Sequence, residues 1–402
     1  RREIPQLEAS VSSTAAIEKG KVNLQRLGFF SVVRVSTRPV PDQPDQVDVI
    51  YDVKEQASGS LSASVGFSQG EGLLLGASVR QNNFLGTGNA LSFNLQSSDS
   101  TKEAKFSFTD PYFTIDGVSR GVELYYAKTD FDETGTADYS TDETGLGLNF
   151  GYPISKESRI SSSFAVQNTT LDAKASGSRA TYIDSFFTSE GFSSSATAAD
   201  FIEYKVGVAY RFDTLNKAFL PTDGTRHRVG FDLSIPGSDL EYYTTSYLGE
   251  TYVPVAAEQD VSLKFKTRLS YGDGFGDSNG LPFLRNFFAG GIRTVRGYTY
   301  NSLGPLENGK QVGGNVLVTG TAALQFPMPG GKEADQARLS LFTDTGQVYD
   351  GSIEVDDLRY SAGAALAWMT PIGPLSFTYV SALNTQAGDE TEGFQFSIGS
   401  TF

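Results

Sequence analysis

The sequence predicts a membrane all-β fold: a 16-stranded antiparallel transmembrane β-barrel, preceded by a partial α+β domain. Two observations predict it. From about residue 57 onward apolar and polar residues alternate with period two, in about sixteen segments of roughly the length that a tilted strand needs to cross a bilayer. The mean hydropathy is nevertheless slightly negative, and no long uninterrupted apolar run occurs. Alternating lipid-facing and water-facing residues produce this average, whereas a membrane-spanning helix would need such a run.

Residues 1–56 follow a different pattern and predict a separate domain that is truncated at its N-terminus. Apolar residues on a helical spacing predict a helix over 14–28 that ends at Gly28. Two strand-like runs follow, 30–37 and 46–55, with a proline-rich turn at 39–44 between them. A helix and one hairpin are too little for a stable domain, so an upstream strand is expected to be missing.

Connection lengths support a barrel over residues 57–402. Every second connection is short, and most of the short ones carry proline, whereas the others include long polar stretches at 129–142, 169–200 and 272–314. Short turns at one rim and long loops at the other are typical of outer-membrane barrels. A soluble β-sandwich is the alternative, but sandwiches do not separate their loop lengths in this way.

Enzymatic, metal and nucleic-acid chemistry are not expected. Gly66–Gly70 matches the nucleophile pattern G-x-S-x-G around Ser68, but strands flank it on both sides, and the single histidine, His227, is predicted at the opposite rim. Residues 130–135 begin like a calcium loop and then depart from its ligand pattern. One histidine and no cysteine make a poor zinc site, and a net charge of −15 disfavours nucleic acid. We therefore expect no catalytic residues, no metal and no cofactor.

One long connection is unusually apolar. Residues 281–298 (LPFLRNFFAGGIRTVRGY) consist largely of apolar side chains, although they lie within the connection at 272–314. A loop of this kind is not expected to hang in water, so we predict that it folds back into the barrel. Arg296 would then lie in the lumen, where a sheltered cation needs an acceptor.

Strand alternation indicates two partners for Arg296. Leu339 and Leu341 are predicted to face lipid, which turns Asp344 toward the lumen. The same reasoning turns Gln325 inward on the preceding strand. We predict a charge-assisted Arg296–Asp344 hydrogen bond worth about 1.5–3 kcal/mol, with Gln325 as a neutral acceptor. The alternative is a solvated loop arginine.

The barrel is predicted to close between its first strand, 60–68, and its last strand, 394–402. Glycine weakens a strand interior, and both strands contain it, so a weak seam with latent strand edges is expected. The alternative is an ordinary closing strand that ends in phenylalanine. The residues predicted to line the seam are Leu61, Ala63, Val65 and Phe67 on the first strand and Phe394, Phe396, Ile398, Gly399 and Phe402 on the last.

Short motifs along the chain form a specific set. They are NLQRLGFF (23–30), PDQVDVI (44–50), NFLGTG (83–88), DPYFTIDG (110–117), FLPTDG (219–224), IPGSD (235–239), VRGY (295–298), VGGN (312–315) and FQFSIG (394–399). With these motifs the chain resembles, over essentially all of its length, the BamA family, whose members insert β-barrel proteins into the bacterial outer membrane. VRGY alone marks only the wider superfamily.

This resemblance implies a function and a site. It implies a last POTRA domain in the periplasm, unfolded outer-membrane barrel clients, periplasmic lipoprotein partners, contact with outer-membrane lipid, and a lateral gate between the first and last strands. Asp344 falls on a carboxylate partner of the loop arginine, whereas relatives carry glutamate where this chain has Gln325, so a one-carboxylate clamp is expected. Gly399 falls where the family's last strand bends inward. The family's loop motif falls on Val295, Arg296, Gly297 and Tyr298.

Two other functions stay open at the level of sequence. One is a secretion pore of the same superfamily, and the other is a related barrel that assembles autotransporters. The motifs outside the loop favour the BamA family over both. A passive porin is not expected, because it would neither carry VRGY in its loop nor follow an α+β domain.

Overall fold

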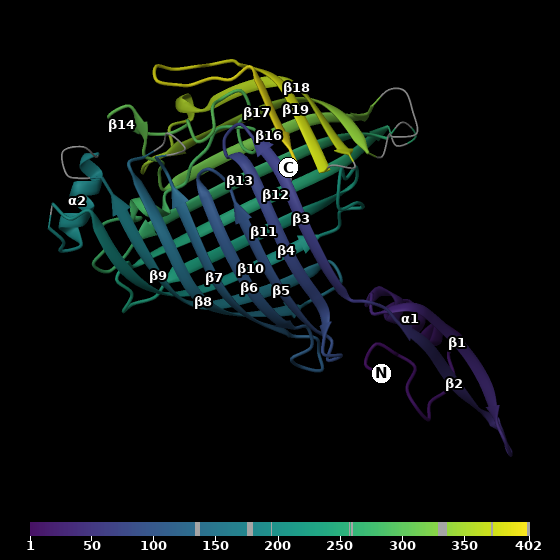
Figure 1. The fold of residues 1–402 in the computed structure, drawn as a ribbon. Helices are drawn as coiled ribbons and strands as arrows, with labels where there is room; N and C mark the ends of the chain where they lie inside the picture. Colours follow the sequence, from purple (N-terminus) through teal and green to yellow (C-terminus); the bar gives the residue numbers. More distant parts are fainter. Residues whose placement is uncertain are drawn as a thin grey trace. The chain divides into compact units, whose positions relative to one another are not determined.

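The computed structural model describes residues 1–132, 137–174, 180–193, 195–256, 258, 260–328, 336–370 and 373–399 (Figure 1). The chain divides into two compact units. One consists of Arg1–Leu61 together with Val79–Ser92, and the other of the remaining residues. No helix among the described residues is long and apolar enough to cross a membrane.

The N-terminal residues form the predicted helix and hairpin. Helix α1 spans Thr14–Arg26, and the Ser13 hydroxyl caps it by accepting from the Ala16 amide. Ile17 and Leu24 lie on its buried face. Gly28 follows with φ 69°, a left-handed conformation that glycine adopts without strain, so the predicted end of the helix is confirmed.

The proline-rich turn predicted at 39–44 is present but shorter, because only Pro41 and Asp42 lie between the two strands. Strands β1 (Phe30–Val40) and β2 (Gln43–Glu55) run further than expected and form a two-stranded antiparallel sheet. Pro39 pairs with Val47 inside the ladder. Both strands of a two-stranded sheet have an outer edge that needs no amide donor, so proline is tolerated there.

Sixteen antiparallel strands close into a barrel, as predicted (Figure 1). Each is paired with its neighbours in chain order, and β20 returns to pair with β3. The barrel strands are β3 (Gly59–Ser68), β4 (Gly72–Phe84), β5 (Asn89–Ser97), β6 (Thr101–Asp110), β7 (Ser119–Asp130), β8 (Tyr139–Pro153), β9 (Ser158–Ala173), β10 (Ala198–Asp213), β11 (Gly224–Ser234), β12 (Tyr242–Ala256), β13 (Val261–Gly274), β16 (Val316–Pro327), β17 (Ala337–Tyr349), β18 (Arg359–Thr370), β19 (Gly373–Ala382) and β20 (Phe394–Ile398).

Side chains alternate between an apolar outer face and a mixed inner face along these strands. On β10, Ile202 and Tyr204 are exposed outward, whereas Phe201 and Glu203, which alternate with them, are buried. An alternation of exposed apolar and inward polar residues is the pattern of a strand with lipid on one side and a lumen on the other.

The loops on one rim are shorter than the sequence suggests because the strands extend into them. In the structure, the three long connections named above span residues 131–138, 174–197 and 275–315. The second of these is not only a polar loop, because it contains helix α2 (Thr181–Ser189). Ile183 and Phe187 of α2 are fully buried in an aromatic cluster that also takes in Phe283 of the third connection. This cluster is called the cap below.

Candidate functional site: the seam and the loop inside the barrel

The connection between β13 and β16 packs against the inner wall, as its apolar sequence predicts. Val295, Tyr298 and Leu303 are fully buried, and they form a cluster with Leu317 of β16 and Val348 of β17. The sharp bend of the motif falls at Gly297, which has φ 92° and lies against Val380. A side chain there would be strained in φ as well as crowded, so the VRGY bend requires glycine.

Arg296 makes a bidentate ion pair with Asp344 on β17. Its Nε and Nη2 donate to the two carboxylate oxygens at 2.7 and 2.8 Å, and its backbone amide donates to Oδ2 at 3.1 Å. The guanidinium carbon lies 3.3 Å from the centre of the Phe342 ring, two residues earlier on the same strand. The Asp344 side chain is fully buried. Among the described residues, Arg296 is the cation that donates hydrogen bonds to it.

Gln325 is not a partner of Arg296, which corrects the sequence-based expectation. The register of β16 and β17 places Thr321, not Gln325, opposite Asp344. Gln325 lies four residues further along β16, about 13 Å away at 3.3 Å per residue. Its Oε1 is buried without a hydrogen-bond partner among the described residues. The Gln325 side chain points into the lumen as predicted, but its height along the barrel wall was not predicted.

The loop motif is also joined to the last strand. Gln395 of β20 is almost fully buried; its Nε2 donates to the Tyr298 carbonyl at 2.8 Å, and its Oε1 accepts from the Gly297 amide at 3.2 Å. Just before β20, the Thr299 amide donates to the Glu390 carbonyl at 2.9 Å and the Glu392 amide to the Gly297 carbonyl at 3.0 Å. The segment 297–299 therefore pairs with 390–392 through the backbone as well as through Gln395.

The seam between β20 and β3 is short in the described part of the chain. Its register contains two residue pairs, Ser397 with Ser68 and Ile398 with Phe67, whereas β19 and β20 share five. Gly399 follows with φ 70° and approaches Val65 so closely that a Cβ would lie 2.5 Å from its carbonyl oxygen. Glycine thus permits the crossing of the two strands at this point.

On the outer face, aromatic and aliphatic side chains flank the seam. The Phe67 and Phe396 rings stack across it with centroids 5.6 Å apart, and Phe394 stacks on Phe396. Leu61, Ala63 and Val65 are exposed along β3. Phe402, the remaining residue predicted for the seam, lies outside the described residues.

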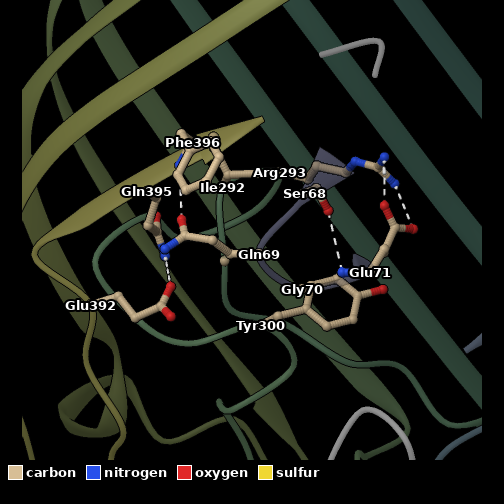
Figure 2. Close-up of a pocket in the computed structure, with 11 residues that line it drawn as sticks. Ser68, Gln69, Gly70, Glu71, Ile292, Arg293, Tyr300, Glu392, Gln395 and Phe396 are labelled. Carbon is tan, nitrogen blue, oxygen red and sulfur yellow. Dashed lines mark hydrogen bonds and ion pairs between the residues drawn. The ribbon is translucent and has the colours of Figure 1, made fainter. Parts of the chain in front are cut away.

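A glutamine side chain extends the seam beyond the backbone ladder. Gln69 stands in the β3–β4 turn; its Nε2 donates to the Phe394 carbonyl at 3.3 Å, and its Oε1 accepts from the Phe396 amide at 2.8 Å. Figure 2 shows this side chain reaching the edge of β20. The primary amide supplies one donor and one acceptor to a strand edge, as a peptide unit of a neighbouring strand would. We call this pair of contacts the Gln69 latch.

The same turn is joined to the loop. Arg293 and Glu71 form an ion pair at 2.8 Å, and Tyr300 packs over Gly70, where a Cβ would lie 2.3 Å from the ring (Figure 2). The loop therefore contacts both sides of the seam, β20 through Gln395 and the β3–β4 turn through Arg293. Sequence reasoning missed Gln69, Arg293 and Gln395, because polar residues at strand ends have no distinctive pattern until the register is known.

The residues considered for other chemistry take up unrelated contacts. The Ser68 hydroxyl accepts from the Glu71 amide, whereas both ring nitrogens of His227 lie against the hydroxyls of Thr225 and Tyr247. Within the described ranges, no group of three or more histidine, aspartate or glutamate side chains is placed to hold a metal. Asp132, from the loop with a calcium-like start, pairs with Lys310 and Lys174.

Fold and site together define a membrane β-barrel whose closing seam is braced by a loop folded into its lumen. The sequence model described as the Omp85 superfamily domain matches residues 83–402, and a POTRA model, described as a surface antigen variable number repeat, matches residues 1–56. The chain belongs to the Omp85 superfamily.

Individual relatives agree with this assignment. The chain is 32% identical to the outer membrane protein assembly factor BamA of Neisseria meningitidis, over all of this chain and 54% of that protein. The crystal structure of Haemophilus ducreyi BamA lacking POTRA domains 1–3 matches all of this chain and 81% of that one, with a TM-score of 0.91 and 30% identity. CdiB from Acinetobacter baumannii shares only the fold, with a TM-score of 0.61 at 14% identity, covering 98% of this chain and 70% of that one. The chain spans about half the length of the curated BamA relatives it matches.

Proposed function

We propose that this barrel inserts and folds β-barrel proteins in the bacterial outer membrane through a lateral gate between β3 and β20. The observation that carries the proposal is the seam itself. Among the described residues, two ladder pairs, the Gln69 latch and one ring stack join β3 to β20, whereas β19 and β20 share five pairs and β9 and β10 share fifteen. A short seam is the place where the fewest hydrogen bonds must break for strand edges to become available.

In this proposal the client supplies the free energy. An unfolded barrel strand that adds to an open edge gains a ladder of backbone hydrogen bonds and buries its outer face in lipid. No covalent bond is made or broken, and no nucleotide or metal takes part. The clients are unfolded outer-membrane barrel proteins, the N-terminal residues lie in the periplasm, and periplasmic lipoproteins and outer-membrane lipid are the other expected partners. The similarity to BamA proteins supports each of these assignments.

The loop would hold the gate strands in a competent arrangement. Arg296 fixes the loop to β17, and the backbone of 297–299 with Gln395 fixes it to the last strand. A loop placed in this way positions β20, and its connection to the β3–β4 turn through the more exposed Arg293–Glu71 ion pair is the one that would break for β3 to separate. Secretion of an unfolded chain is the other function within the superfamily, and it would need an open lumen in place of an open seam.

A disulfide across the seam tests the gate. Ser68 and Ser397 are direct register partners, a geometry that suits a disulfide, and the 402 residues contain no cysteine to interfere. With both changed to cysteine, we expect folding of a barrel client in lipid vesicles to stop on oxidation and to return on reduction. The matched control joins Ser397 to Ser376, its partner on β19, and should not respond.

The two outcomes separate the proposals. Full client folding with the Ser68–Ser397 disulfide formed would exclude the lateral gate. Steady ion conductance through the barrel with the seam locked would favour the secretion pore instead.

A further inference from the structure

A second arginine of the loop lies against the opposite wall of the lumen, with its side chain 14% exposed. Arg285 ends the short 3-10 helix η2 (Phe283–Arg285) and forms ion pairs with two carboxylates, Glu143 on β8 and Glu203 on β10. It also donates to the Thr169 hydroxyl on β9 at 3.0 Å. One side chain thereby contacts three consecutive strands of the barrel.

Glu203, one of the two carboxylates that Arg285 contacts, has further hydrogen-bond partners. Glu203 is completely buried; one oxygen accepts from the Tyr242 hydroxyl at 2.6 Å, and the other accepts from Thr169 at 2.9 Å. Lys205 lies 3.7 Å from Glu203, so two cations balance two anions in this cluster. Loss of Arg285 would leave an unbalanced buried negative charge, which is strongly unfavourable in a site that excludes water.

The cap fixes Arg285 from the rim side. The Phe283 ring packs edge-to-face on Tyr139, Tyr182 and Phe186, with centroids 4.8 to 5.0 Å apart. Leu284 is buried in the same cluster. The two residues that precede Arg285 are therefore held by apolar packing, which fixes the backbone from which the guanidinium reaches the carboxylates.

Arg285 and Arg296 join the loop to different parts of the wall. Arg296 stands eleven positions later in the chain and binds β17, whereas Arg285 binds β8 to β10. The segment between the two arginines is held by contacts within the loop. Ala289 forms a bridge with Leu303, and Gly290 exchanges hydrogen bonds with the Thr294 hydroxyl. A loop fixed at one end only could swing about that end, and the second fixed point removes this freedom.

We propose that Arg285 is a positioning residue of the gate, the anchor that sets where the VRGY bend meets the last strand. This inference deepens the proposed function. The loop arginine that binds two carboxylates is Arg285, with Glu143 and Glu203, whereas Arg296 binds one. Arg285 touches neither strand of the seam and acts through segment 297–299. Lysine cannot replace it fully, because one ammonium does not reach two carboxylates with the geometry of a guanidinium.

The test reads the position of the loop directly. Thr299 and Glu390 are joined by a backbone hydrogen bond, so cysteines at these two positions report whether 297–299 lies against 390–392. In the T299C/E390C background, Arg285→Gln should slow disulfide formation by at least about tenfold. A tenfold change corresponds to about 1.4 kcal/mol less free energy holding segment 297–299 against 390–392. Arg285→Lys should restore part of the rate.

A matched control separates positioning from general loss of stability. Arg338 is another buried arginine on a carboxylate, Asp260, at the rim with the short turns and away from the loop. Arg338→Gln should leave the Thr299–Glu390 disulfide rate within about twofold of the parent. Glu143→Gln, which removes one charge of the clamp and keeps Arg285, serves if Arg285→Gln does not fold, and it should slow the rate several-fold.

Two results would overturn the inference. The first is an unchanged rate of disulfide formation in Arg285→Gln, or in Glu143→Gln if Arg285→Gln does not fold. The second is an equal slowing in Arg338→Gln. The readout is independent of client folding, so a positive result stands even if the lateral gate is excluded. If the gate holds, client folding should fall in parallel with the disulfide rate.

Discussion

Removal of the Arg296 side-chain charge tests how much the loop contributes to the barrel. Arg296→Met keeps most of the volume and the contact with the Phe342 ring but leaves the Asp344 carboxylate, which is fully buried, without its cation. Breaking a buried pair from one side costs about 3–5 kcal/mol, because the remaining charge stays in a site of low polarity. The two side-chain hydrogen bonds at 2.7 and 2.8 Å, at about 1.5–3 kcal/mol each, sum to about 3–6 kcal/mol, which overlaps this range.

The assay is urea-induced unfolding of the barrel in lipid vesicles, followed by the mobility difference between folded and unfolded chains. Arg296→Met should lower the free energy of unfolding by about 3–5 kcal/mol, and the double variant R296M/D344L should recover at least half of this, because it removes both charges. Arg293→Met is the matched control: its partner Glu71 is partly exposed, and such pairs contribute about 0–1 kcal/mol. A loss below about 1 kcal/mol in Arg296→Met, equal to that of the control, would refute the reasoning.

Two further predictions concern the latch and the rim. Gln69→Leu removes both latch hydrogen bonds, so hydrogen exchange at the Phe396 amide should accelerate by about tenfold, since one net hydrogen bond contributes about 0.5–1.5 kcal/mol; an unchanged exchange rate would mean that the latch does not hold the edge. Hydrogen bonds from Lys310 and Lys174 hold the pKa of Asp132 below its ordinary value, so their stabilisation is complete above about pH 4 and is lost as pH falls through the lowered pKa. Protease cleavage of the loops around Lys310 should therefore stay constant from about pH 5 to pH 9 and rise in stronger acid, and Lys310→Gln should reduce this acid response.

Alternation along the strands was sufficient to predict the inner and outer faces but not heights within the barrel. It placed Asp344 in the lumen, where Arg296 binds it. It also placed Gln325 in the lumen correctly, yet that residue pairs with Ser340 and lies four positions from the level of Asp344. A period-two pattern specifies a face, whereas the relative shift of two strands depends on hydrogen-bond register, which sequence alone does not specify.

Arg285 was missed although signals for it were present. Glu203 stands between the outward-facing Ile202 and Tyr204, and Glu143 alternates with the set that includes the outward-facing Leu146 and Leu148, which predicts two carboxylates in the lumen. Arg285 is the one cation within the apolar run at 281–288, so it was the candidate to pair with these carboxylates.

Helix α2 was missed for a different reason. Tyr182, Ile183, Phe186 and Phe187 follow a helical spacing, but they lie in a connection rich in serine and threonine that reads as a polar loop. The helix is stabilised by burial of Ile183 and Phe187 in the cap. Tertiary packing decides such short helices, because nine residues are too few to be stable by propensity.

The way the loop is divided between the two sides of the seam bears on permeability. It is joined to the last strand by backbone pairing and a buried glutamine, but to the β3–β4 turn by an ion pair whose arginine is 43% exposed. If the seam parts as proposed, the weaker connection should break first, and the loop should stay with the last strand and the anchored walls. The lumen would then remain blocked while the barrel is open at its side, so that a strand could enter from the membrane without small solutes leaking across it.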